Sequence, residues 1–130
     1  MIALFFLGVL LLCHSHAINY PDANEVMTKL PQTFMIQSLG NYPNLICGYQ
    51  HFYNETRRGQ TYLKYDSQFK YPDRLIGLSL YVRNVTGYKI IMATRPESVF
   101  PATYSRHILF SNMKSCMIIK NPDPAFPQGW

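Results

Sequence analysis

The sequence lacks low-complexity runs, heptad repeats and internal repeats, and no apolar run after the N-terminal one is long enough to cross a membrane. It is also short, with 130 residues, so a second domain is not expected. Aromatic residues, by contrast, are plentiful, with 10 Tyr and 8 Phe. A chain of this composition can bury a hydrophobic core, which excludes disorder and predicts one small folded domain.

Charged side chains are absent from residues 1–17, which read MIALFFLGVLLLCHSHA. An apolar run from Ile2 to Leu12 is followed by the small residues Ser15 and Ala17 in an A-x-A-like arrangement. This pattern is typical of a secretory signal peptide, and the run is too short for a transmembrane helix. We therefore expect cleavage after Ala17, a domain over residues 18–130, and a secreted, extracellular protein with no membrane attachment.

Few cysteines and histidines are left once the predicted signal peptide is removed, namely Cys47, Cys116, His51 and His107. A zinc finger and a CxxC redox motif are therefore excluded, and no metal or cofactor is expected. Unpaired cysteines are uncommon in secreted proteins, so both remaining cysteines are disulfide candidates. One interpretation joins Cys47 to Cys116, which would close a long, stabilising loop.

Two N-glycosylation sequons agree with passage through a secretory pathway. They are Asn54 in Asn-Glu-Thr and Asn84 in Asn-Val-Thr. We predict that both asparagines carry glycans.

Short segments rich in Val, Ile, Tyr, Phe and Thr recur between turn-forming residues, which predicts mainly β-structure. The stretch ANEVMTKL, residues 23–30, is predicted to form a short helix that Pro31 ends. The short connections favour an all-β, antiparallel up-and-down meander. Strands are predicted at residues 33–39, 45–53, 60–69, 75–83, 87–93, 103–110 and 115–120.

Alternating residues indicate which face of this sheet is apolar. Residues 75–82 place Ile76, Leu78, Leu80 and Val82 on one face. The same period groups Leu63, Tyr65 and Phe69, and then Tyr88, Ile90 and Met92. A sheet with such a face either packs on a second sheet or closes into a barrel around a ligand.

The order of these segments resembles that of the salivary lipocalins of ticks, which include the histamine-binding proteins. The resemblance is carried by PDANEVMTKL, TFMIQSL, LICGYQHFYNET and TYSRHILFSNMKSCMIIK. It implies a lipocalin-like β-barrel with a short N-terminal helix. Members of that family continue through a further strand and a helix with cysteines that pair with the equivalents of Cys47 and Cys116. The ending NPDPAFPQGW disfavours a further strand, so we expect a C-terminally shortened, incomplete barrel in which Cys116 lacks that partner.

The resemblance implies capture of a small host mediator, namely histamine, another biogenic amine or an eicosanoid, which blunts host defence. Amine-binding members carry an acid directly after the cysteine, where this chain has Met117. An ammonium group that leaves water needs such a carboxylate. Arg106 shares a predicted face with Phe110, so a lipid mediator with an anionic end is the expected ligand in preference to histamine. The candidate ligand-binding residues are Tyr49, Tyr65, Tyr88, Arg106 and Phe110.

Two other functions are alternatives to ligand capture. His51 and His107 suggest a ribonuclease-like acid and base pair, but no catalytic motif accompanies them, so no enzyme is expected. The net charge of +5 suggests a basic binding module for a host protein or a glycosaminoglycan. The basic residues are scattered, with only Arg57 and Arg58 adjacent, and no nucleic-acid partner is predicted.

Overall fold

The computed structural model describes residues 20–38 and 40–122 of the chain. The predicted signal peptide, its cleavage site and the chain end after residue 122 lie outside the described residues. Among the described residues, no helix is long and apolar enough to cross a membrane. The elements are α2 (Ala23–Lys29), β1 (Gln32–Phe34), β2 (Cys47–Arg57), β3 (Gln60–Lys70), β4 (Leu75–Thr86), β5 (Lys89–Ala93), β6 (Tyr104–Ser111) and β7 (Met117–Lys120).

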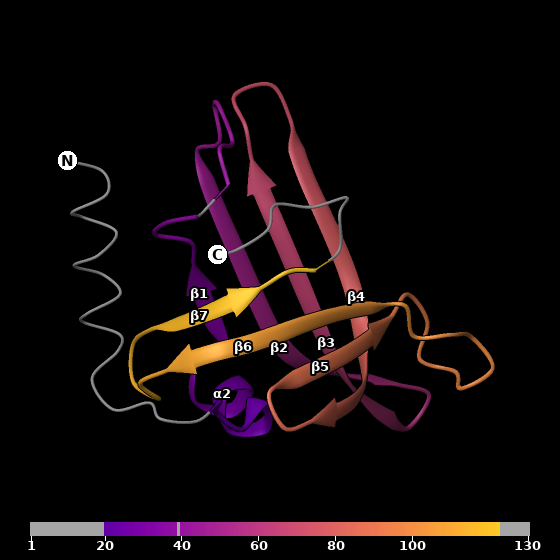
Figure 1. Ribbon diagram of the computed structural model, residues 1–130. Helices are drawn as coiled ribbons and strands as arrows, with labels where there is room; N and C mark the ends of the chain where they lie inside the picture. The colour runs from indigo at the N-terminus through magenta and orange to yellow at the C-terminus, as the bar shows by residue number, and fades with distance from the viewer. Residues whose placement is uncertain (1–19, 39, 123–130) are drawn as a thin grey trace.

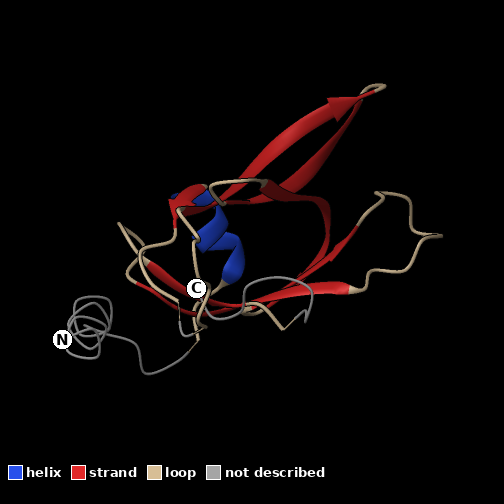
Figure 2. Cartoon of the chain, turned by 90° about the horizontal axis from the view of Figure 1, so that it is seen from above, coloured by secondary structure: helices blue, strands red, loops and turns tan. Residues whose placement is uncertain are grey.

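All seven described strands belong to one antiparallel sheet, in which each strand pairs with its neighbours in the sequence (Figure 1). The predicted up-and-down meander is therefore confirmed. The described sheet is not closed, because its order runs from β1 at one edge to β7 at the other without a pairing between them. Figure 2 shows that the sheet nevertheless curves strongly, with helix α2 inside the curve.

The β2–β3 hairpin is longer than predicted, and the prediction of a loop over residues 54–59 was wrong. The ladder continues to the pair Arg57 and Gln60, which leaves Arg58 and Gly59 as the turn. Both turn residues have positive φ values, 50° and 78°. A two-residue turn of this kind matches the twist of the flanking strands, so they stay paired to the end. Strand β1, by contrast, is shorter than the predicted 33–39.

The short helix α2 is confirmed and is fixed at both ends. The side chain of Asp22 caps its first turn by accepting a hydrogen bond from the Asn24 amide at 3.1 Å. The amide of Ala23 donates to the carbonyl of Gly87 at 2.9 Å, which ties the helix to the β4–β5 turn. Ala23, Val26 and Met27 are buried, so the helix covers one end of the inner face.

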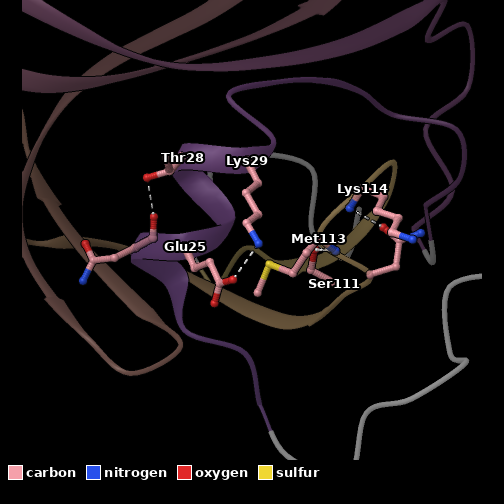
Figure 3. Close-up of polar contacts among 8 residues, drawn as sticks. Glu25, Thr28, Lys29, Ser111, Met113 and Lys114 are labelled. Carbon is pink, nitrogen blue, oxygen red and sulfur yellow. Dashed lines mark hydrogen bonds and ion pairs between the residues drawn. The ribbon is translucent and has the colours of Figure 1, made fainter.

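The predicted turn between β6 and β7 is confirmed, and Asn112 organises it. The Asn112 side-chain oxygen accepts hydrogen bonds from the amides of Lys114, Ser115 and Cys116 at 2.9–3.1 Å. The hydroxyl of Ser111 accepts from the amide of Met113 at 3.0 Å. Figure 3 shows Ser111, Met113 and Lys114 of this turn, together with the ion pair of 2.9 Å between Lys29 and Glu25 on helix α2. The hydrogen bonds to Asn112 and Ser111 fix the shape of the turn and so set where β7 begins.

Alternation identified the inner face of the sheet correctly for most strands. The hydrophobic core consists of inward side chains from β2 to β7 together with helix α2. Its fully buried sheet members include Tyr65, Phe69, Leu80, Ile90, Met92, Ile108 and Ile119. A register shift between Val82 and Asn84 and another between Ile108 and Phe110 bend the strands that carry this face.

Candidate ligand site on the inner face

Four polar side chains interrupt the apolar inner face, and we call them the inner polar cluster. They are Gln50 on β2, Tyr65 and Ser67 on β3, and Arg106 on β6. Each is at most 1% exposed. Polar groups in such a position are costly to bury unless they are hydrogen-bonded.

Gln50 joins three parts of the sheet through its side-chain amide. Its oxygen accepts a hydrogen bond from the Tyr65 hydroxyl at 3.1 Å. Its nitrogen donates to the Thr33 hydroxyl at 2.8 Å and to the sulfur of Met117 on β7 at 3.3 Å. A thioether is a weak acceptor, so one of the two amide hydrogens of Gln50 is only weakly hydrogen-bonded.

Ser67 lies directly opposite Gln50 in the β2–β3 ladder. Directly opposed side chains are close neighbours on one face of an antiparallel sheet. The Ser67 hydroxyl is buried and makes no hydrogen bond within the described part of the chain. The unsatisfied hydroxyl of Ser67 therefore lies beside the weakly hydrogen-bonded amide of Gln50.

Arg106 brings a permanent positive charge to the inner face. Its guanidinium carbon lies 5.4 Å from the centre of the Tyr65 ring, and its Nη1 donates to the Ser105 carbonyl at 2.7 Å. Its neighbour across the β5–β6 ladder is the fully buried Ile90. Arg106 thus lies on the inner face between Tyr65 and Ile90.

The structure brings together three of the five predicted ligand residues. Tyr65, Arg106 and Phe110 all lie buried on the inner face. Tyr49 lies on the outer face, where its ring is 5.1 Å from that of Phe34 and 6.1 Å from that of His51. These contacts separate Tyr49 from the inner polar cluster.

Tyr88 also lies apart from the cluster. Its ring stacks on Tyr20 at 4.2 Å and meets the edge of His107 at 5.6 Å. Tyr88 precedes β5, which begins at Lys89, so the alternation of that strand does not extend to it.

Gln50 and Ser67 were not predicted as site residues. The signal that identifies them is again alternation, since Gln50 stands between Gly48 and Phe52, and Ser67 stands between Tyr65 and Phe69. The inner face was assigned from hydrophobic residues alone. Polar residues in the same alternating row, such as Gln50 and Ser67, were therefore left out of the site.

The two cysteines of the predicted mature chain are not joined to each other. Cys47 is a free, half-buried thiol, whereas Cys116 is disulfide-bonded. Cys47 begins β2 and Cys116 immediately precedes β7, and these strands lie near opposite ends of the sheet order. That Cys116 lacks the later cysteine with which the family pairs its equivalent stays a prediction.

The remaining predicted residues lie outside the cluster. Asn54 and Asn84 are exposed, on β2 and β4, and their glycosylation stays a prediction. His51 and His107 lie on different strands. The side-chain nitrogen of Gln32 is 3.3 Å from Nε2 of His51, whereas the ring of His107 lies beside that of Tyr88. No group of three or more metal-ligating side chains occurs within residues 20–38 and 40–122.

The outer face of the sheet carries a compact set of tyrosines and charges. Lys64 lies 4.7 Å from the centre of the Tyr81 ring, and its ammonium is 3.7 Å from Glu55. Burial raises the pKa of Tyr53, and a hydrogen bond to Asp66 raises it further. Burial lowers the pKa of Lys64, but the charges of Tyr53, Tyr81 and Glu55 outweigh it and leave the pKa raised.

Comparison with known proteins does not assign this site. No protein-family model, no curated protein and no solved structure matches the chain significantly.

Proposed function

We propose that the protein binds one small, mainly apolar ligand with an anionic, oxygen-bearing end on the inner face of its sheet. In this proposal the chain is a secreted carrier that captures a small mediator, as the tick salivary lipocalins that it resembles do. A lipid mediator such as an eicosanoid is the preferred ligand. The curved meander, its apolar inner face and the inner polar cluster support this assignment.

The observation that carries the proposal is that the neighbouring side chains of Gln50 and Ser67 have hydrogen-bonding capacity that the described residues do not satisfy. The Ser67 hydroxyl has no hydrogen-bond partner within the described residues, and a Gln50 amide hydrogen points to the sulfur of Met117. One ligand oxygen placed between these neighbours would accept hydrogen bonds from both. Ligand sites of this type are mainly apolar with a few polar groups that fix the orientation of the ligand.

The charge of the site favours an anion over an amine. Arg106 is the cation of the cluster, and no Asp or Glu is among the buried residues of the described chain. A carboxylate near a desolvated guanidinium is stabilised by charge-assisted hydrogen bonds, whereas an ammonium there is repelled. Histamine should therefore bind weakly or not at all.

Met117 is the side chain that a ligand would displace. It is unbranched and only partly buried, and it lies on β7, at one edge of the described sheet. Methionine adapts readily to new packing, so its movement costs little. Replacement of its weak contact with Gln50 by a ligand oxygen improves the hydrogen bonding of the amide.

Titration calorimetry on the folded protein tests the proposal with arachidonate and histamine as the two probes. We expect saturable arachidonate binding that weakens by about tenfold or more in Arg106→Gln. Arg74→Gln is the matched control, because it also removes one positive charge, from a side chain that is 56% exposed and outside the cluster. It should change the affinity by less than about twofold.

Three outcomes contradict the proposal. One is tight, saturable histamine binding. Another is arachidonate binding that Arg106→Gln and Ser67→Ala leave unchanged. The third is no arachidonate binding at all by a protein whose cooperative unfolding shows that it is folded.

A further inference from the structure

The loop over residues 94–103 exposes two large apolar side chains at its end. This loop joins β5 to β6 and projects away from the sheet in both views (Figures 1 and 2). Val99 is 81% exposed and Phe100 is 42% exposed. We call these two residues the apolar tip. Their exposure to water is unfavourable, and the two residues are adjacent in the chain.

Hydrogen bonds hold the loop in this projecting form. Arg83 donates from Nη1 to the carbonyls of Phe100 at 2.9 Å and Arg95 at 3.3 Å. The amide of Phe100 donates to the carbonyl of Glu97 at 3.1 Å, which closes the turn that carries Val99. Arg83 is the extra residue where the β4–β5 register shifts, and such a bulge redirects a side chain. The tip is therefore supported from the sheet.

Two arginines lie beside the apolar tip. The Arg95 guanidinium lies 5.4 Å from the centre of the Phe100 ring, and Arg83 supports the loop from β4. Glu97 is the one acid in residues 94–103. Two arginines thus lie close to two exposed apolar side chains, in a chain with a net charge of +5.

We propose that the apolar tip inserts into the surface of a lipid bilayer that contains anionic headgroups, while Arg83 and Arg95 lie at headgroup level. Two apolar side chains are far fewer than a specific protein interface needs, since such interfaces bury about 1,000 Å² or more. A peripheral membrane contact needs only a few inserted side chains together with nearby cations. The composition of the tip therefore fits a bilayer better than a protein partner.

Vesicle flotation tests this inference on the full secreted chain, and it does not depend on the small-ligand proposal. The probes are vesicles of phosphatidylcholine alone and of phosphatidylcholine with phosphatidylserine. We expect binding to the anionic vesicles, which added salt weakens. The double variant Val99→Ser with Phe100→Ser should reduce this binding by about tenfold or more, because it removes the apolar surface that enters the bilayer.

The matched control is Ile36→Ser with Leu75→Ser, which removes two exposed apolar side chains elsewhere, at 70% and 61% exposure. It should change vesicle binding by less than about twofold. Hydrogen exchange should also show protection of residues 97–101 when anionic vesicles are added. The inference is overturned if the wild type does not float with anionic vesicles, or if both double variants lose binding equally. Protection of another segment in place of residues 97–101 also contradicts it.

Discussion

At the scale of single residues, Ser67 combines burial with an unsatisfied hydroxyl. In the absence of ligand, Ser67→Ala should raise the free energy of unfolding by about 1 kcal/mol, because it removes a buried polar group that gains no hydrogen bond. The same variant should weaken arachidonate binding. Urea denaturation measures the first effect and calorimetry the second.

Ser79→Ala is the matched control for that variant. The hydroxyl of Ser79 donates to the Asp66 carboxylate on the exposed outer face. Its removal should leave stability unchanged or lower it, and should not affect ligand binding. A stability loss in Ser67→Ala would show that the Ser67 hydroxyl is hydrogen-bonded after all.

The raised pKa of Tyr53 predicts how stability changes in alkali. A tyrosine with a raised pKa in the folded state stays neutral there while the unfolded chain ionises above its ordinary value of 10.0. The contribution of this tyrosine to the free energy of unfolding is fully present below pH 10.0 and is lost as the pH rises through the pKa of the folded state. The raised pKa of Lys64 acts in the same direction.

Urea midpoints measured between about pH 9 and pH 11 test this prediction. The wild type should lose stability over this range, and Tyr53→Phe should lose less. Tyr20→Phe serves as the control, because Tyr20 is 60% exposed and lies away from Asp66 and Lys64. An identical alkaline loss in wild type and Tyr53→Phe contradicts the prediction.

At the scale of elements, Gly48 in β2 leaves room on the inner face for the side chain of Met35, which follows β1. A Cβ at this position would lie 3.0 Å from Met35 and 3.4 Å from Phe69. Gly48→Ala should therefore lower the free energy of unfolding by about 1–3 kcal/mol through overpacking. Gly77→Ala in β4 is the control, because its Cβ would meet nothing closer than 3.8 Å.

Thermal unfolding of the two variants separates packing from the general effect of replacing glycine in a strand. Gly77→Ala should be neutral or slightly stabilising, since alanine restricts the unfolded chain more than glycine does. Equal stability of the two variants would mean that Met35 moves aside without cost.

The strands were predictable where their residues alternate and their turns are marked by glycine. The row from Ile76 to Val82 indicated the inner face of β4, and Leu80 is fully buried there. The end of β2 was missed because Arg58 takes a left-handed conformation that its residue type does not announce. Local pattern does not reveal such a turn when a bulky residue occupies it.

At the scale of the whole molecule, the antiparallel meander was predictable and the shape of the sheet was not. Short connections determine which strands are neighbours, but closure depends on the twist and bulges summed over the sheet. The same limit applies to the candidate site. Alternation placed Tyr65 and Arg106 on one face, whereas the contact between Gln50 and Met117 depends on how far β7 curves toward β2.

The central claim is that a small anionic, mainly apolar ligand binds on the inner face, and its location can be measured directly. Isotope-filtered nuclear Overhauser spectra of the protein with bound arachidonate report which side chains lie beside the ligand. We predict contacts from the ligand to Tyr65 and Met117 on the inner face, and none to Tyr49 or Tyr62 on the outer face. Contacts confined to Tyr49 and Tyr62 would contradict the account.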